Sequence, residues 1–300
     1  MFRIAYSEIY RLPLPENHRF PMIKYELIPS QLLYEGTIRK EQLFLPVSVN
    51  RKYLELVHHT DYIDKLLSLN LSDKEIRKSG FPLSPALIER EWIITGGTCI
   101  CADHALRDGI SFNIAGGTHH ASSSQAEGFC LLNDQAVAAA RLLNDKKAKS
   151  ILIIDLDVHQ GNGTAEIFKN NPAVFTFSMH AGHNFPLQKE KSDLDIALPD
   201  QCDDDEYLSK LEEALKKIIP EIQPDFIFYQ SGVDVLKTDK LGRLHLTREG
   251  CKERDRMVFE TTHSNSIPVV VTMGGGYSEK IADIVEAHCN TFRVADSIYH

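Results

Sequence analysis

The residues best suited to hold a metal ion lie in one short segment, Asp155-Leu156-Asp157-Val158-His159. The segment follows the apolar run Ile151–Ile154, which is typical of a buried strand. Because alternate side chains of an extended chain point the same way, Asp155, Asp157 and His159 project from one face. Burial without partners would cost these charged groups roughly several kcal/mol each. A divalent cation would remove that cost, so the segment predicts a metal site at the end of a strand.

A third candidate ligand is Asp234, which comes shortly after another apolar run. A catalytic zinc site keeps three protein ligands and leaves one position for water or substrate, and Asp157, His159 and Asp234 would make such a set. Taken alone, Asp234 would more often cap a turn, and Asp155 and Asp157 could pair with buried arginines. The presence of all of them on one rim of a sheet favours the metal site.

Two consecutive histidines, His119 and His120, follow a double glycine and suit general acid–base chemistry. Each histidine requires a partner that orients its ring, and Asp155 and Asn162 are the candidates. A charged partner raises the pKa of a histidine more than a neutral amide does, so the two rings would differ in basicity. Tyr277, which follows three glycines, could donate a hydrogen bond to a developing oxyanion or could pack against the end of the sheet.

A further motif is Gly128-Phe129-Cys130. Phe129 could belong to the core, or it could wall a narrow passage that grips an alkyl stem. Cys130 could act as a nucleophile beside the histidines. A thiol nucleophile would leave the acidic metal set without an explanation, so we do not favour that interpretation.

The composition is that of an ordinary globular protein, with 300 residues, 43% of them hydrophobic and 25% charged. A net charge of −9 without a basic stripe argues against direct nucleic-acid binding. The six cysteines form no CxxC pair, so we expect reduced thiols. No apolar run approaches membrane-spanning length, and the N-terminus lacks a signal-like stretch. We therefore expect a cytoplasmic protein, and a nuclear location stays open if the source is eukaryotic.

Short apolar runs alternate with helical patterns through the second half of the chain. The expected strands are Ser111–Ala115, Ile151–Asp155, Val174–Met179, Asp225–Gln230 and Pro268–Met273, and the expected helices between them are Asp134–Asn144, Gly163–Lys169, Asp205–Ile219 and Arg248–His263. Apolar strands between helices predict an α/β fold, a single domain over residues 1–300 in which an open parallel sheet carries helices on both faces.

The first part of the chain is less regular. Leu54–Leu67 is expected to be a helix. Leu12–Pro29 and Leu71–Pro85 carry prolines and charges, and we expect loops or short helices that cover a sheet edge or the mouth of a site. Each motif described above follows an expected strand. Since ligands of open α/β sheets bind outside the carboxyl ends of the strands, we expect the motifs to converge on one pocket.

Taken together and in this order, the motifs resemble the zinc-dependent histone deacetylase family, within the arginase/deacetylase fold. The matching stretches are Gly-Gly-x-His-His-Ala at 116–121, Gly-Phe-Cys-x-x-Asn-Asp at 128–134, Asp-Leu-Asp-Val-His-x-Gly-Asn-Gly-Thr at 155–164, Gly-Val-Asp at 232–234 and Gly-Gly-Gly-Tyr at 274–277. Stretches 12–21 and 204–208 are most similar to the class IV branch and its bacterial relatives. With them, the resemblance covers most of the chain.

The resemblance implies a role for each position. Asp157, His159 and Asp234 would bind one zinc ion per chain. The acid–base pair would be His119, held by Asp155, and His120, held by Asn162, with Tyr277 donating to the tetrahedral oxyanion. The Gly128 carbonyl would accept the substrate amide N–H, and Phe129 would line the acyl-lysine tunnel, with Phe185 as the candidate for its second aromatic wall. A structural potassium ion would touch Asp155, Asp157, His159, Ser178 and Met179.

The chain departs from the family pattern at three points. Asn162 stands where another branch carries aspartate, and Gln160 replaces a frequent histidine. No residue clearly matches the rim aspartate that holds a peptide backbone in some members, which puts peptide substrates in doubt but leaves acyl-amide hydrolysis untouched.

The function we expect is a zinc amidohydrolase that removes an acetyl or longer acyl group from the ε-amine of lysine, in a protein, a peptide or a small acylated amine. Long-chain fatty-acyl lysine and acetylated polyamines are alternative substrates. A catalytically silent acyl-lysine binding module is an alternative of another class. A two-metal ureohydrolase of the arginase type would need carboxylate ligands where His119 and His120 stand. The sequence leaves the oligomeric state open.

Overall fold

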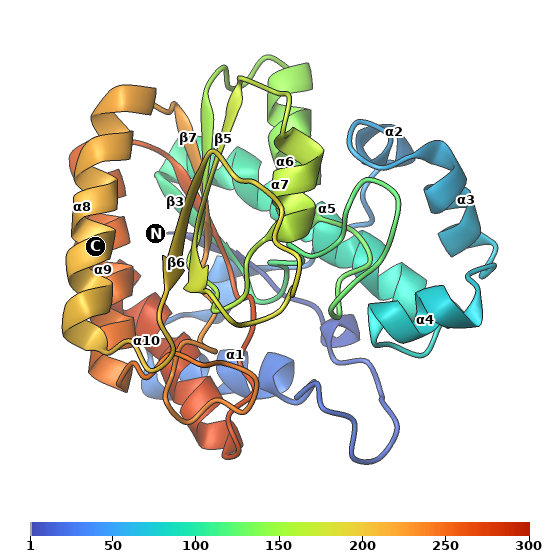
Figure 1. Cartoon of the computed structure of the whole chain (residues 1–300), viewed down its shortest axis with the longest axis horizontal. Coiled ribbons are helices and arrows are strands. Elements are labelled where there is room, and N and C mark those ends of the chain that lie inside the picture. The colour runs from blue at the N-terminus through green and yellow to red at the C-terminus, as the bar shows by residue number, and fades with distance from the viewer. Residues whose placement is uncertain (1) are drawn as a thin grey trace.

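The computed structural model describes residues 2–300 and is built around one eight-stranded sheet (Figure 1). The strands are β1 (Arg3–Ala5), β2 (Leu43–Phe44), β3 (Ile110–Asn113), β4 (Ile151–Asp155), β5 (Val174–Ala181), β6 (Leu194–Leu198), β7 (Phe226–Gln230) and β8 (Val269–Thr272). Every neighbouring pair is parallel, in the order β2-β1-β3-β8-β7-β4-β5-β6. The predicted α/β class with a parallel sheet is confirmed.

Helices cover both faces of the sheet, as predicted. The helices are α1 (Lys24–Glu35), α2 (Arg51–Leu54), α3 (Thr60–Leu67), α4 (Asp73–Ser79), α5 (Pro85–Asp108), α6 (Asp134–Asn144), α7 (Asn162–Phe168), α8 (Asp204–Ile222), α9 (Arg248–Ser264) and α10 (Ile281–Tyr299). In Figure 1, α8 and α9 lie on one side of the sheet and α5 and α6 on the other. No helix of residues 2–300 combines the length and the apolarity needed to cross a bilayer.

The side chains of the two sheet faces belong to two separate hydrophobic cores, because alternate residues of each strand point in opposite directions. In β4, Leu152 and Ile154 join the core beneath α1, α8, α9 and α10. Ile151 and Ile153 of the same strand join the core beneath α5 and α6. Both faces of the central strands are therefore dry, which explains their unbroken apolar sequences.

Side-chain caps begin three of the predicted helices. Asn133, Asp203 and Thr247 each accept a hydrogen bond from the backbone N–H three residues later, at 3.1, 3.2 and 3.0 Å. Such caps satisfy N–H groups that have no partner inside the helix. They fix the starts of α6, α8 and α9 close to the bounds that the sequence predicted.

The predicted helix over Leu54–Leu67 is wrong. The chain forms two short helices there, α2 and α3, and residues 55–59 turn between them. His59 donates its backbone N–H to the carbonyl of Ser123 at 2.8 Å. This contact with the loop after β3 competes with a continuous helix. The segment 71–85 contains the short helix α4, and α1 begins inside the segment predicted as irregular, at Lys24.

A helix around Cys99 and Cys101 was expected, but the full length of α5 was not, because glycines and β-branched residues crowd its centre. Its two central glycines allow close packing. A Cβ on Gly96 would lie 1.8 Å from the carbonyl oxygen of Val47, and one on Gly97 would lie 2.7 Å from the Tyr10 hydroxyl. Tertiary packing thus stabilises this helix although the helix propensity of its central residues is low. The final helix α10 and the edge strand β6 were also absent from the prediction.

A buried ion pair in α9 ties that helix to the site end of the sheet. Arg254 is fully buried and pairs with Asp255 at 2.8 Å. The guanidinium also donates to the carbonyls of Gly232, at 2.5 Å, and Leu156, at 3.3 Å. These carbonyls belong to the loops after β7 and β4. Arg254 therefore joins the two loops that carry the candidate metal ligands.

We expect Asp255→Ala to lower the free energy of unfolding by about 3–5 kcal/mol, because it leaves a buried arginine without its partner. Glu253→Ala in the same helix is the control. Glu253 pairs with Arg256 at 3.2 Å, but its side chain is 49% exposed, and its loss should cost less than about 1 kcal/mol. Urea unfolding followed by circular dichroism measures both variants, and similar losses in the two would contradict this account.

Candidate active site

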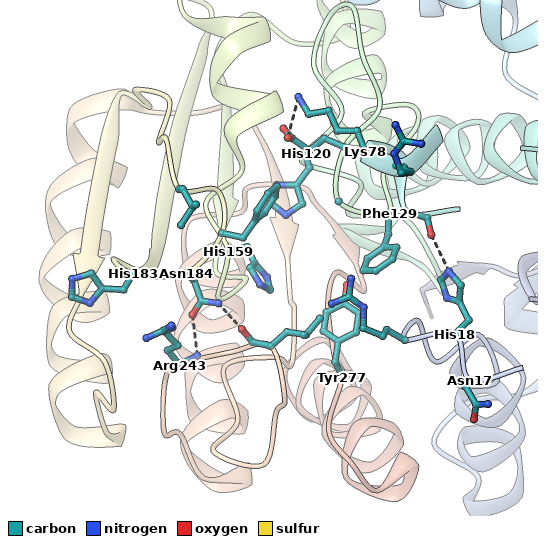
Figure 2. A pocket seen from close by; sticks show the side chains of 18 residues that line it. Asn17, His18, Lys78, His120, Phe129, His159, His183, Asn184, Arg243 and Tyr277 are labelled. Carbon is teal, nitrogen blue, oxygen red and sulfur yellow. Dashed lines mark hydrogen bonds and ion pairs between the residues drawn. The ribbon is translucent and has the colours of Figure 1, made fainter. Parts of the chain in front are cut away.

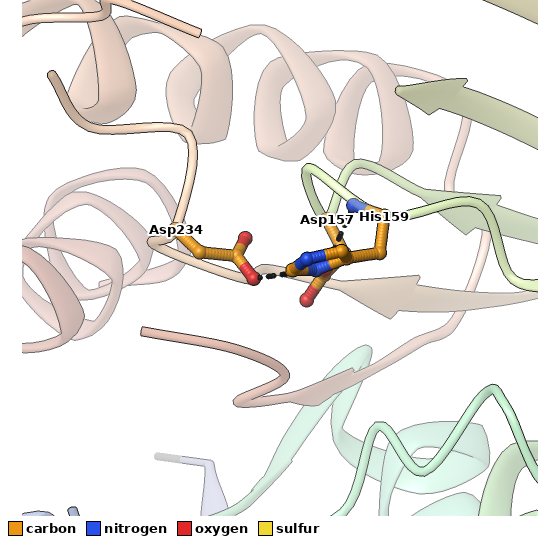
Figure 3. A group of neighbouring side chains, drawn as sticks. All are labelled: Asp157, His159 and Asp234. Atoms are coloured by element: carbon orange, nitrogen blue, oxygen red, sulfur yellow. Dashed lines mark hydrogen bonds and ion pairs between the residues drawn. The ribbon is translucent and has the colours of Figure 1, made fainter. Parts of the chain in front are cut away.

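Asp157, His159 and Asp234 converge at the carboxyl ends of β4 and β7, which are neighbours in the sheet. Each offers one ligand atom, and the three atoms lie within 4.8 Å of one another (Figure 3). His159 Nδ1 lies 3.1 Å from Asp157 Oδ1 and 3.1 Å from Asp234 Oδ2. All three residues are buried. Two carboxylates and an imidazole in this arrangement fit a divalent cation with an open position.

The electrostatics of the trio favour a cation. Burial alone would lower the pKa of His159, but hydrogen bonds to Asp157 and Asp234 outweigh it and raise that pKa to about 10. Burial and the neighbouring Asp157 raise the pKa of Asp234 to about 7. The negative potential of the two carboxylates stabilises a proton on the His159 imidazole. The same potential would stabilise a metal ion that replaces this proton.

The two adjacent histidines have different partners, as the sequence predicted. His119 Nδ1 lies 2.7 Å from Asp155 Oδ2, and His120 Nδ1 lies 2.6 Å from Asn162 Oδ1. The partners of Asp155 and Asp157 are histidines and not the buried arginines that were the alternative. The ring centroids of the histidine pair lie 4.0 Å apart.

The pKa values of the two histidines shift in opposite directions. Burial lowers the pKa of His119, but the charges of Asp155 and Asp157 outweigh it, and the pKa ends above its ordinary value. Burial lowers the pKa of His120 well below its ordinary value, and the neighbouring His119 and His159 lower it further. The pair therefore combines a ring whose surroundings favour the charged form with a ring whose surroundings favour the neutral form.

Tyr277 follows β8 and reaches the same end of the sheet. Its backbone N–H donates to Asp239 at 2.6 Å, which fixes the turn that carries the side chain. Its ring packs 6.0 Å from the rings of Phe20 and Phe129, measured between centroids. Burial and then the carboxylates of Asp234 and Asp157 raise the pKa of the Tyr277 hydroxyl well above its usual range. The hydroxyl thus keeps its proton and is able to donate it in a hydrogen bond.

A cavity of about 820 Å³ opens above these residues. Figure 2 shows Phe129 and Tyr277 on its wall, with His120 and His159 toward its base. The structure also places Phe185 on this cavity, with its ring centroid 4.9 Å from that of His120. Gly128 has a positive φ of 54°, and a Cβ there would lie 2.6 Å from the His120 ring. The loop therefore passes this close only because the residue is glycine.

A much smaller inner cavity of about 30 Å³ is lined by Asp157 and His159 of the trio. Its lining includes Phe20, Tyr25, Gly117 and Cys130. Burial raises the pKa of the Cys130 thiol well above its ordinary value, so the thiol is a poor nucleophile.

Two of the residues predicted to hold potassium, Asp157 and His159, belong to the trio, and the other three lie on the neighbouring strands β4 and β5. Asp155 and Ser178 face each other across β4 and β5, and Met179 follows on β5. Ser178 Oγ lies 3.0 Å from His180 Nδ1. The potassium ion itself stays a prediction.

Several residues that shape the site were missed from the sequence. Asp239 holds the Tyr277 turn, and Lys24 donates its Nζ to the carbonyl of Gly274 at 2.9 Å. Burial lowers the pKa of Lys24 to about 8. Glu127 contacts Asn162. None of these residues stands in a motif or a periodic pattern, and only the position of Glu127 beside Gly128 could have drawn attention to it.

Comparison with known proteins gives a consistent result. The family model described as "Histone deacetylase domain" matches residues 18–292. An uncharacterized protein of Picosynechococcus sp. is 44% identical over 99% of this chain and 99% of its own length. Histone deacetylase 1 of Homo sapiens is 30% identical over 93% of this chain and 61% of its own length. A crystal structure of an HDAC homolog complexed with SAHA superposes with a TM-score of 0.85 at 26% identity, covering 99% of this chain and 84% of that chain.

We expect metal binding to release at least about one proton per chain near pH 7, because a ligating imidazole must give up its proton and the pKa of metal-free His159 is about 10. Apparent affinity should therefore rise as the pH increases from 7 toward 10. Calorimetric titration of the chelator-treated protein with Zn²⁺, in buffers of different ionisation enthalpy, measures the proton count and the stoichiometry. Binding of one ion without proton release, or of two ions per chain, would contradict the site described above.

Proposed function

The chain belongs to the histone deacetylase family, and from that premise we propose that it is a zinc-dependent hydrolase that removes acyl groups from the ε-amine of lysine. The proposal rests chiefly on one observation: Asp157, His159, the two histidines and Tyr277 all border the inner cavity, and three of them also border the outer one. Asp234 completes the metal trio 3.1 Å from His159. The family supports deacetylase chemistry in general. The ion, the roles of individual residues and the substrate belong to the proposal.

A zinc ion held by Asp157, His159 and Asp234 would supply Lewis acidity, which polarises the acyl carbonyl and lowers the pKa of a bound water to about 7. The protein supplies the proton transfers. His120 stays neutral at pH 7 and accepts a proton from the attacking water, and it then gives this proton to the departing amine. His119, which favours its charged form, stabilises the negative charge that develops beside it.

Tyr277 is proposed as the oxyanion donor, since its hydroxyl keeps its proton and its ring borders both cavities. The Gly128 carbonyl would accept the substrate amide N–H. Phe129 and Phe185 would hold the alkyl stem of lysine between two aromatic faces. The half-exposed Phe185, with 38% of its surface accessible, reaches the mouth of the cavity.

The inner cavity favours a short acyl group. The lysine stem occupies the outer cavity, so the acyl chain must extend past the trio into the inner one. That space measures about 30 Å³, and a single water needs roughly 10–15 Å³ on the same measure. An acetyl methyl fits such a space. A long fatty-acyl chain would require Phe20 or Tyr25 to move, so we propose acetyl-lysine ahead of the long-chain alternative.

We expect turnover of acetyl-lysine peptides to exceed that of myristoyl-lysine peptides, because the inner cavity is small. Activity should vanish with a chelator and return with Zn²⁺. A liquid-chromatography assay of matched peptides that differ only in acyl length measures both effects. Faster removal of myristoyl would overturn the acetyl assignment, and binding without turnover by the metal-replete protein would support a silent acyl-lysine binding module.

Tyr277→Phe should lower kcat by about 100- to 1,000-fold, the usual cost of losing one oxyanion donor. Tyr34→Phe is the control, since Tyr34 is 90% exposed and should keep full activity. Steady-state kinetics on an acetyl-lysine peptide compares the two variants. A Tyr277→Phe enzyme with unchanged kcat would remove Tyr277 from the proposed mechanism.

A further inference from the structure

A chain of three polar contacts leads from His120 out of the reaction centre. His120 Nδ1 lies 2.6 Å from Asn162 Oδ1, and Asn162 Nδ2 donates to Glu127 Oε2 at 3.0 Å. The other carboxylate oxygen of Glu127 pairs with Lys78 Nζ at 3.0 Å. Figure 2 shows Lys78 and this ion pair beside the cavity. The first contact belongs to the histidine pair already described, but the outer two have no role in the proposed mechanism.

An amide partner alone does not determine which ring nitrogen of a histidine carries the proton. Asn162 presents an acceptor on one side and a donor on the other, so it could serve either tautomer of His120 by turning over. The tautomer matters, because only a ring protonated at Nδ1 presents an unprotonated Nε2 toward the cavity. His119 does not face this ambiguity, since its partner Asp155 only accepts hydrogen bonds.

Glu127 removes the ambiguity. An ionised carboxylate accepts hydrogen bonds and donates none, so the NH₂ group of Asn162 must face Glu127. The amide oxygen then faces His120, whose Nδ1 must carry the proton. Lys78 pairs with Glu127, whose side chain is only 15% exposed, and so holds the carboxylate beside Asn162.

The backbone holds Glu127 in place. The N–H of Gly128 donates to the carbonyl of Lys78 at 3.1 Å, and the N–H of Phe129 donates to that of Ser79 at 2.8 Å. The turn that carries Glu127 is thus bound to the end of α4. These backbone hydrogen bonds therefore hold Lys78 and Glu127, the two members of the ion pair, next to each other.

We propose that Glu127 is a positioning residue of the enzyme: it fixes the amide of Asn162 and thereby holds His120 in the tautomer that can accept a proton at Nε2. The inference rests on the proposed function for the role of His120 as a base. An asparagine-based pair needs this third residue, whereas an aspartate-based pair does not.

Glu127→Gln is the direct test, because glutamine keeps the size of the side chain but presents either a donor or an acceptor to Asn162. We expect His120 to divide between its two tautomers in this variant, and kcat to fall by about 10- to 100-fold, the usual range for residues that orient a functional histidine. KM should change little, because Glu127 does not hold the substrate. ¹⁵N NMR of the imidazole nitrogens measures the tautomer without any substrate.

Glu166→Gln is the matched control. Glu166 accepts hydrogen bonds from the backbone N–H of Ser123 at 2.9 Å and from its hydroxyl at 3.0 Å, and so supports the same loop. Within residues 2–300 the side chain of Glu166 forms no hydrogen bond with the side chain of Asn162 or His120. This variant should keep the wild-type tautomer of His120.

A second substitution should rescue the first. In the Glu127→Gln background, Asn162→Asp places an accept-only group beside His120, and the glutamine introduced at position 127 can donate to the far oxygen of that group. This double variant should regain the Nδ1-protonated tautomer and most of the lost kcat. Asn162→Asp alone should not improve the enzyme, because it sets two carboxylates face to face.

The tautomer measurement decides the outcome. A single Nδ1-protonated His120 in folded Glu127→Gln protein would refute the inference, and so would a loss of kcat that the double variant fails to restore while its tautomer is correct. Should the wild-type protein hydrolyse no acyl-lysine, the proposed function would fail, yet the NMR comparison would still show whether Glu127 sets the tautomer.

Discussion

The site is organised around negative charge that has been taken out of water. Asp155, Asp157 and Asp234 are all buried at one end of the sheet, where carboxylates repel one another and lack solvent. Imidazoles offset part of this charge: His119 pairs with Asp155, and His159 lies between the other two. A cation held among these groups would offset the charge that remains. The sheet, the loops and the buried arginine of α9 keep the groups from separating.

The order of the strands explains how distant segments share this end of the sheet. β3, β8, β7 and β4 are neighbours in the sheet. Strands far apart in the sequence thus become adjacent: β3, which begins at residue 110, pairs with β8, which begins at residue 269. The loops that follow these four strands carry the histidine pair, Tyr277, Asp234 and the Asp157–His159 segment. Because the strands are parallel, all four loops leave from the same edge. The dry cores on both faces give the sheet the rigidity that a site with tolerances of a few tenths of an ångström requires.

The sequence predicted the elements that have a regular apolar pattern, and it missed features that depend on a single tertiary contact. The central strands were recognised because burial on both faces requires unbroken apolar runs such as Ile151–Ile154. The full length of α5 was missed because Gly96 and Gly97 are favourable only where Val47 and Tyr10 pack against them. The metal trio and the histidine pair were recognised by residue type and spacing. Glu127 lies 35 positions from Asn162, and a lone glutamate carries no signal of such a contact.

One turn of chain, residues 127–129, serves two purposes at once. It carries Phe129, which lines the outer cavity, and the carboxylate that faces Asn162, and it is bound to α4 by its backbone. Phe185 lines the same cavity from the loop after β5, from which no side chain among residues 2–300 hydrogen-bonds to His119, His120 or Asn162. A lineage under selection for new substrates would therefore accumulate changes on the Phe185 side, while the Phe129 side would remain nearly immutable.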